Sequence, residues 1–443
     1  MHIRKIQLSN IRGFREVDLD LTRPDGSLAG WTVLAGRNGS GKSTLLKAIA
    51  LAAAGKEVAL RLGLTFEDWI RAGSGEASTL LELSSGEPTA PLRWTRNGDP
   101  DEPDLHEGEI QEAIQGLREE LQTDPQSATT RSLQTLVKQV AEKRFIAAYG
   151  PYRRLTGEAP DARRLMAGPV PIARLVSLFR EDASLIECVV WLKENYVRKL
   201  EEKEGAAELE KAVLDLLGDG LLDGVRVEKF DSAGLWISQN NVRLPFGVLS
   251  EGYRTVAALV LDLIRHLHRT FGTLQIEPAA DQEGSFLRVL HSGVVLIDEV
   301  DNHLHVSWQQ RIGFWLKRHF PNIQFIVTTH SPFICQAADP GGLIRLPAPG
   351  EELFVEHVSE DLFNTVVHGG LDQAVLTKLF GLQSPYSMKT ERLRDAVAHL
   401  EAAFQRGKAT EADGATLEEL RSRLPRTMSS AVEQALRALA VER

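Results

Sequence analysis

The sequence is poor in cysteine and contains no long apolar segment. Its 443 residues include two cysteines, Cys188 and Cys335, which lie far apart in the chain. This spacing gives no support to a disulfide framework or a zinc site, and it suits a reducing compartment. The longest apolar run, residues 255–264, is interrupted by Asp262 and is too short to span a bilayer. The first residues show no signal-peptide pattern, so we expect a cytoplasmic protein without membrane contact.

The chain also lacks the positive charge that a general nucleic-acid binder carries. Lysine and arginine number 51 against 61 aspartate and glutamate residues, and the formal net charge is −10. DNA or RNA binding would therefore need a local patch. Residues 143–200 form a basic segment with interleaved tyrosines, which is either a nucleic-acid groove or a solvated helical face with a few arginines that serve another site. The basic residues that stand out are Arg153, Arg154, Arg163, Arg164, Arg174, Arg180, Arg198 and Lys199.

The most informative stretch is a glycine-rich segment between an apolar run and a helical pattern. Residues 31–35 predict a buried strand, and residues 43–54 predict a helix. The turn between them carries the P-loop pattern Gly-x-x-x-x-Gly-Lys-Ser, in which backbone N–H groups bind phosphates. Lys42 supplies charge for the β- and γ-phosphates, and the Ser43 hydroxyl is an oxygen ligand suited to Mg²⁺. The predicted nucleotide-binding residues here are Arg37, Asn38, Gly39, Ser40, Gly41, Lys42, Ser43 and Thr44.

An apolar run that ends in two acidic residues predicts the second half of the site. Residues 294–297 are typical of a central parallel strand, and Asp298 and Glu299 follow at its carboxyl end, where such sheets bind ligands. We expect Asp298 to hold Mg²⁺ and Glu299 to orient and polarise the attacking water as a general base. Acidic residues that merely end a surface strand are the alternative, and the P-loop favours the magnesium site.

Two further segments allow a structural or a functional interpretation. His330 follows a predicted strand at 323–327 and either contacts the γ-phosphate or caps a turn. Ser250, Glu251 and Gly252 begin a predicted helix that extends to residue 268. They form either an ordinary helix cap or a second phosphate-binding device.

Together these motifs resemble the ABC-type ATPase heads of the SMC/RecF superfamily. The sequence is similar in particular to OLD-like ATPases and to the anti-phage ATPases of Septu systems and some retrons, which carry related Asp-Glu-x-Asp-x-His-Leu-His and Thr-His-Ser-Pro runs. The Tyr-Gly-Pro-Tyr-Arg-Arg segment at 149–154 is also similar. The matching segments are Ile6-x-Leu8-x-Asn10-Ile11-x-Gly13-Phe14, the P-loop, the signature-like Leu249–Gly252, the acidic strand end, residues 301–305 at the D-loop position and the switch-histidine segment Thr329–Pro332.

The resemblance implies an α/β fold, an ABC-type P-loop NTPase head with a mixed or parallel sheet flanked by helices. We assign residues 1–103 to the first half of the head, 104–223 to a helical insertion, 224–370 to the second half and 371–443 to a helical tail. The insertion has no sustained heptads, which excludes a long SMC-type arm. No glutamine is assigned to a Q-loop.

The resemblance also implies ATP hydrolysis in a head-to-tail homodimer or higher homo-oligomer. Lys42, Ser43, Asp298, Glu299 and His330 of one subunit would then face Ser250 and Gly252 of the other across ATP and Mg²⁺. We expect an ATPase that acts as a switch or sensor for a separate effector, such as a nuclease, in anti-phage defence. The alternatives are a RecF-like DNA-binding repair ATPase and a regulatory clamp that binds ATP without hydrolysing it.

Two weaker patterns have a more ordinary interpretation. Asp301, His303 and His305 lie near Glu299 and suggest metal ligands, but a dimer-contact loop is favoured. Residues 353–357 resemble the first motif of a Toprim nuclease, with histidine in place of glycine, and a strand of the head is favoured. The tail shows no catalytic arrangement, and we predict a surface for a partner or for self-association.

Overall fold

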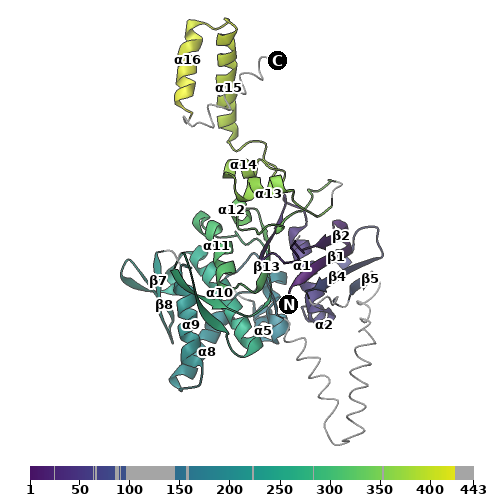
Figure 1. Cartoon of the computed structure of the whole chain (residues 1–443), viewed down its shortest axis with the longest axis vertical. Helices are drawn as coiled ribbons and strands as arrows, with labels where there is room; N and C mark the ends of the chain where they lie inside the picture. The colour runs from purple at the N-terminus through teal and green to yellow at the C-terminus, as the bar shows by residue number, and fades with distance from the viewer. Residues whose placement is uncertain are drawn as a thin grey trace, which may run out of the picture. The chain divides into compact units, whose positions relative to one another are not determined.

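The computed structural model contains two compact units, Met1–Phe380 and Gly381–Arg443. It describes residues 1–95 and 145–424, apart from residues 24, 63, 65–66, 85–88, 90, 156–158, 222–223, 283 and 352–353. The first part of the predicted insertion, residues 104–144, lies outside the described residues. Each unit is described by itself below (Figure 1).

A six-stranded sheet in the order β15-β14-β3-β13-β12-β6 forms the centre of the first unit. All neighbouring strands are parallel except β14 and β15. Every residue of the five parallel strands is buried, as expected for a parallel sheet that is covered on both faces. The strands are β3 (Trp31–Ala35), β6 (Ile146–Tyr149), β12 (Gly293–Ile297), β13 (Ile323–Thr329), β14 (Leu343–Arg345) and β15 (Glu356–His357).

Helices pack on this sheet and carry the functional segments at their amino ends. The helix α1 (Lys42–Ala54) contacts β6, β12 and β13, and α10 (Glu251–Phe271) contacts β6. The short α12 contacts β3 and β13. The remaining helices near the sheet are α2 (Lys56–Arg61), α11 (Val306–His319), α12 (Pro332–Cys335), α13 (Glu360–Val367) and α14 (Leu371–Val375).

A second, antiparallel sheet in the order β2-β1-β4-β5 packs beside α1 (Figure 1). Its alternating buried residues are the ones that the period-two pattern predicts. The buried side-chain amide of Gln324 joins this sheet to β13, because it donates to the Ile3 carbonyl (2.9 Å) and accepts from the Ile3 N–H (2.7 Å). The strands are β1 (Ile3–Ile11), β2 (Phe14–Asp20), β4 (Glu76–Leu83) and β5 (Leu92–Thr95), and a short helix η1 (Glu67–Trp69) precedes β4.

Helices and small antiparallel sheets complete the first unit. The helices α8 and α9 pack on each other and on β7. A three-stranded sheet has the order β7-β8-β9, and β10 pairs with β11. The bounds are α5 (Pro160–Ala167), α6 (Val170–Ala173), α7 (Val176–Phe179), α8 (Glu187–Leu200), α9 (Ala206–Gly218), β7 (Val225–Asp231), β8 (Gly234–Gln239), β9 (Val242–Pro245), η2 (Phe246–Val248), β10 (Ile276–Asp281) and β11 (Gly284–Val289).

The second unit is a helical hairpin with its own small core. The helices α15 (Met388–Gln405) and α16 (Glu411–Ser422) bury Val397, Leu417 and Leu424 between them. None of the helices in the described ranges is both long enough and apolar enough to cross a bilayer.

The α/β head with carboxyl-terminal helices is confirmed, but two details differ from the predicted boundaries. Residues 146–149, placed in a helical insertion, form β6 and pair with the strand before Asp298. A buried run of four apolar residues has no periodicity that separates strand from helix, which explains the difference. In addition, α14 groups with the first unit, so the division falls after Phe380 and not after residue 370. Glu356 and His357 lie in β15 of the central sheet, as the preferred interpretation of that segment requires.

Candidate nucleotide-binding site

The P-loop is the turn that connects β3 to α1. At two of its positions, Gly36 and Gly41, there is no space for a side chain. A Cβ on Gly36 would lie 2.8 Å from the Ser40 hydroxyl and 2.9 Å from the Leu346 carbonyl oxygen. Gly41 has φ = +87°, and a Cβ there would lie 2.6 Å from the ring of Phe14. Phe14 of the Gly13-Phe14 motif therefore packs directly on the P-loop. Both glycines keep the backbone curled, so its N–H groups are available for an anion.

Lys42 and Ser40 are arranged as a phosphate site requires. The side chain of Lys42 is 6% exposed, and its ammonium donates to the carbonyls of Gly36 (2.9 Å) and Arg37 (3.2 Å). Burial lowers the pKa of Lys42, and the nearby carboxylates of Asp298, Glu299 and Asp301 oppose this shift. The Ser40 hydroxyl is buried and has no hydrogen-bond partner among the residues that the structure describes. An unpaired buried hydroxyl within the P-loop fits a bound phosphate oxygen.

Asp298 and Glu299 follow β12 and are both tied to Thr328 of β13. Asp298 is 3% exposed, and its Oδ1 accepts a hydrogen bond from the Thr328 hydroxyl (2.6 Å). The same hydroxyl accepts from the backbone N–H of Glu299 (2.7 Å). The other carboxylate oxygen of Asp298 therefore remains available to a metal ion. Ser43 of α1 is half-buried, so part of its surface is still accessible. The hard oxygen donors of Ser43 and Asp298 fit Mg²⁺.

Replacing Thr328 by valine is expected to lower ATP turnover about tenfold, because a net loss of one or two buried hydrogen bonds is worth about this factor. The change keeps the shape of the side chain but removes its hydrogen bonds with the Asp298 carboxylate and the Glu299 backbone N–H. Turnover is measured with Thr365→Val as a control, which removes a hydroxyl that donates to the Asp361 carbonyl in α13. Wild-type turnover in a folded Thr328→Val protein would contradict this role.

Arg153 is a site residue whose position in the fold was not predicted from the sequence. The residue is 2% exposed, and its guanidinium donates to the carbonyls of Gly150 (2.7 Å), Asp298 (2.9 Å), Glu299 (3.0 Å) and Val300 (3.3 Å). Burial lowers the pKa of Arg153 to about 10, opposed by Asp301, Asp298 and Glu299, so the side chain remains charged. Glu299 has φ = +45°, a strained conformation for a residue with a side chain. Arg153 therefore stabilises the turn that presents Glu299.

The electrostatic environment of Glu299 and His330 suits the roles predicted for them. Burial, Asp298 and Asp301 raise the pKa of Glu299, against the effects of Lys42 and Arg153. A carboxylate with a raised pKa is a better proton acceptor. Partial desolvation of its ring and the charge of Lys42 lower the pKa of His330, although the residue is exposed overall, so its imidazole is neutral at neutral pH. These interactions bring Lys42, Asp298, Glu299 and His330 into one electrostatic cluster.

The helix-cap alternative for His330 is not favoured by the structure. Ser331 occupies the N-cap position of α12 and accepts from the Phe333 N–H (3.2 Å). His330 lies one residue earlier and is exposed. The preceding Thr329 donates to the Asp301 carboxylate and so connects this strand end to the 301–305 loop. An exposed imidazole beside Lys42 is therefore available to a ligand.

The segment Ser250–Gly252 packs against the 301–305 loop. Ser250 is the N-cap residue of α10, but its hydroxyl is exposed and makes no capping hydrogen bond. A Cβ on Gly252 would lie 2.8 Å from the His303 carbonyl oxygen, so this close approach requires glycine. Glu251 is exposed in the first turn of the helix. Among the described residues, no hydrogen bond joins this segment to the P-loop of the same chain.

The metal-ligand interpretation of the 301–305 loop is not supported. His305 is the N-cap of α11 and accepts from the Ser307 N–H (3.3 Å). Asp301 accepts from Thr329. In the described parts of the chain, no group of three or more histidine, cysteine or acidic residues is placed to hold a metal ion.

The basic segment 143–200 does not present all of its arginines to solvent. Arg153 and Arg174 are both 2% exposed. Arg174 lies over the Phe145 ring (5.2 Å to its centroid) and donates to Thr270 (3.4 Å). Arg163 and Arg164 are exposed but form ion pairs with Glu187 and Asp161. Two of the basic residues are therefore internal, where they hold the fold together.

Comparison with known proteins supports an ATPase assignment. An AAA-domain family model matches residues 5–219, and a second AAA-domain model, whose description names the AbiEii toxin and type IV TA systems, matches residues 193–336. Septu protein PtuA of Bacillus mycoides (strain KBAB4) is 27% identical over 330 residues, which are 74% of this chain and 38% of that protein. The "Retron Ec83 probable ATPase" of Escherichia coli is 44% identical over 105 residues, 24% of this chain and 17% of that protein.

The chain thus spans less than two fifths of the length of these relatives. Among solved structures, an SMC head bound to the C-winged helix domain of ScpA is 15% identical and has a TM-score of 0.46, with 82% of this chain and 99% of that chain covered. The two AAA-domain models and the Septu and retron relatives confirm the resemblance predicted from the motifs. The chain is therefore similar to AAA-domain proteins and, over parts of its length, to the Septu and retron proteins.

Proposed function

We propose that this protein binds ATP with Mg²⁺ and hydrolyses it between two head-to-tail copies, and that this cycle switches a separate effector in anti-phage defence. The cluster of Lys42, Asp298, Glu299 and His330 around the P-loop is the observation that carries the proposal. The unpaired Ser40 hydroxyl in the same loop adds to it. The names of the Septu and retron relatives support the setting in defence.

Each residue in the site has a distinct role in the proposed reaction. Lys42 exchanges its bonds with the Gly36 and Arg37 carbonyls for bonds with the β- and γ-phosphates. Ser43 and Asp298 would hold Mg²⁺, which when bound neutralises charge on the phosphates. Glu299 accepts a hydrogen bond from the attacking water and takes its proton. The neutral imidazole of His330 donates to a γ-phosphate oxygen.

The signature segment supports a site shared between two copies. The Ser250 hydroxyl and the amino end of α10 face solvent, with no hydrogen bond to the P-loop of their own chain among the described residues. A helix amino end with free N–H groups attracts the phosphates of a nucleotide bound to a second copy. Because Gly252 packs on the 301–305 loop, occupation of this face is coupled to Asp301 and Thr329.

The effect of ATP on the mass of the Glu299→Gln protein tests the shared site. Sedimentation is expected to show a larger species with ATP and Mg²⁺ than without nucleotide or with ADP. A Ser250→Arg change in the same background places a bulky cation at the contact, and the nucleotide-dependent species is expected to disappear. An unchanged mass in ATP would refute the shared site.

Turnover is expected to depend on pH through Glu299. The general base must be deprotonated, so turnover falls as pH decreases through the pKa of Glu299. Because burial, Asp298 and Asp301 raise this pKa, the midpoint is expected above the ordinary value of 4.5. A rate profile over the range in which the protein stays folded measures the midpoint. A midpoint below the ordinary value would contradict the assigned environment.

The RecF-like repair alternative loses Arg153 and Arg174 as DNA contacts because both are buried, whereas Arg163 and Arg164 are exposed. The non-hydrolysing clamp makes a different prediction for turnover. Comparing wild-type turnover with that of Glu299→Gln separates it from the proposal.

A further inference from the structure

A pocket apart from the nucleotide site lies between α9 and the strands β7, β10 and β11. Its volume is about 720 Å³, and none of its lining residues belongs to the nucleotide site. Apolar side chains such as Leu214, Val227 and Leu287 form part of its wall. The charged residues in the lining are Glu210, Asp215, Asp219 and Glu228 together with Lys199 and Lys211. A mixed wall of this kind suits a ligand that has both an apolar and a charged part.

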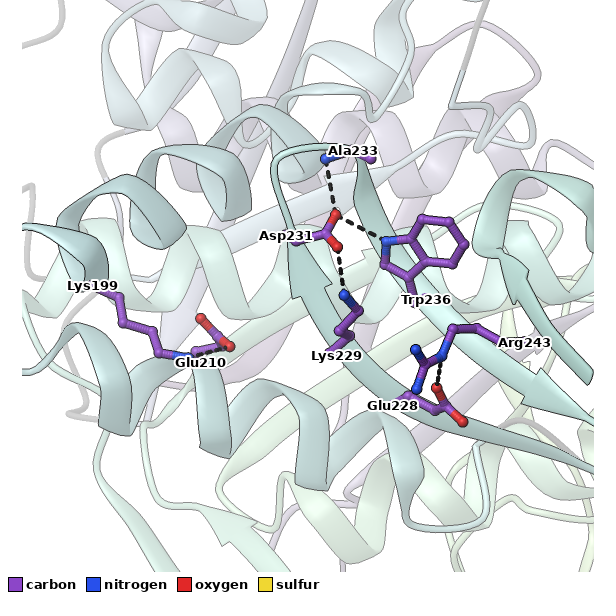
Figure 2. Close-up of polar contacts among 8 residues, drawn as sticks. All are labelled: Lys199, Glu210, Glu228, Lys229, Asp231, Ala233, Trp236 and Arg243. Carbon is purple, nitrogen blue, oxygen red and sulfur yellow. Dashed lines mark hydrogen bonds and ion pairs between the residues drawn. The ribbon is translucent and has the colours of Figure 1, made fainter. Parts of the chain in front are cut away.

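Glu210 lines this pocket, and one of its two carboxylate oxygens is buried without a hydrogen-bond donor in the described structure. The residue is 7% exposed, and its Oε1 accepts from the Lys199 ammonium at 2.9 Å (Figure 2). The other oxygen, Oε2, is buried and accepts no hydrogen bond from the described part of the chain. A buried carboxylate oxygen without a partner is unfavourable. The pocket therefore favours a ligand that donates hydrogen bonds to Glu210.

The pairing of the other charges leaves the pocket acidic. Glu228 accepts from Arg243 at 2.5 Å, on the strands β7 and β9 (Figure 2). Asp215 and Lys211 have no ion pair in the described structure, and both are exposed. Asp219 lies 3.8 Å from the ring nitrogen of His319, and burial lowers the pKa of that histidine. Once the Lys199–Glu210 and Arg243–Glu228 pairs are set aside, the lining keeps two acidic residues, Asp215 and Asp219, against Lys211.

We propose that this pocket binds a basic segment of a partner protein, with an arginine or lysine side chain directed at Glu210. The cationic group donates to the free Oε2, the aliphatic stem packs on Leu214 and Val227, and Asp215 attracts a neighbouring basic residue. The pocket volume exceeds that of one side chain, which fits a short peptide better than a single ion. The biological meaning of this site depends on the proposed effector, but its binding chemistry does not depend on ATP.

A labelled acetyl-tetra-arginine amide peptide tests the proposal without nucleotide. Fluorescence anisotropy on the full chain is measured at about 0.15 M NaCl, where long-range attraction is largely screened. We expect Glu210→Gln and Asp215→Asn each to weaken binding about fivefold or more, since each removes an acidic group from the contact. The matched control is Glu16→Gln, which removes one negative charge from an exposed position on β2 and should leave binding unchanged.

Several outcomes would overturn the proposal. These are an absence of binding at about millimolar peptide, where even weak contacts register, an equal loss in the Glu16→Gln control, and equal binding of a tetra-glutamine peptide. Thermal melting of each variant confirms that it is folded. ATP turnover is measured on the same preparations. A wild-type protein that hydrolyses ATP but does not bind the peptide refutes this pocket alone, whereas a wild-type protein that binds the peptide but shows no turnover refutes the proposed ATPase alone.

Discussion

Replacing Glu299 by glutamine is expected to lower ATP turnover by about 10²- to 10³-fold, because a positioned general base contributes about this much to a hydrolytic rate. Glutamine keeps the size of the side chain and the hydrogen bond from the Glu299 backbone to Thr328. It cannot take a proton from water. Since Lys42, Ser43 and Asp298 are unchanged, ATP binding should be retained. Single-turnover kinetics and equilibrium binding of labelled ATP separate these two quantities.

A second variant controls for the general effect on turnover of removing a negative charge near the site. Asp301→Asn also removes a carboxylate that interacts electrostatically with Lys42. It leaves the proposed base in place, so its turnover should fall much less than that of Glu299→Gln. If the Glu299→Gln protein hydrolysed ATP at the wild-type rate, Glu299 would not be the base, and the catalytic part of the account would fail.

Replacing Arg153 by methionine is expected to reduce the free energy of unfolding by about 2–4 kcal/mol, because hydrogen bonds from a charged group are removed and buried carbonyls lose their donors. The affected carbonyls belong to Gly150, Asp298, Glu299 and Val300. We also expect turnover to fall, since Glu299 sits at a positive φ that these bonds help to maintain. Denaturant unfolding and steady-state turnover measure the two effects.

Arg154 provides the control for this prediction within the same motif. It is exposed, and its guanidinium donates to the Glu181 carbonyl (2.7 Å). Arg154→Met should change the free energy of unfolding by less than about 0.5 kcal/mol, as is usual for surface positions. Arg153→Lys keeps the charge but not the forked geometry, and it should lie between methionine and wild type. Equal stability of Arg153→Met and Arg154→Met would contradict the proposed contribution of Arg153.

The candidate nucleotide-binding segments could be predicted from the sequence because their residues lie close together in the chain. Gly36, Gly41, Lys42 and Ser43 lie within eight consecutive positions, and strand and helix patterns flank them. Asp298 and Glu299 end an apolar run, which places them at the carboxyl edge of a parallel sheet. The structure brings Asp298 and Glu299 into the electrostatic surroundings of Lys42, as that argument requires.

The contacts that hold these residues in place could not be predicted from the sequence, because they join segments that are far apart in the chain. Arg153 lies 145 residues before Asp298. In the sequence it looks like one member of a basic surface, and nothing local indicates that it is buried. In the sequence, Thr328 likewise looks like an ordinary strand residue. Its contact with Glu299 depends on the pairing of β12 with β13. Local patterns predict the groups that would contact a nucleotide, whereas the residues that position these groups are found only once the strands pair.

The account depends most on the claim that each nucleotide is bound by two copies of the protein. Mixing the Lys42→Ala protein with the Ser250→Arg protein tests it directly. Each variant alone should lack ATP turnover, because the first loses the phosphate contact and the second blocks the face that covers it. A mixed dimer contains one intact site, so turnover should return when the two are combined. Wild-type turnover of the Ser250→Arg protein alone, or a mixture as inactive as its components, would contradict the shared site.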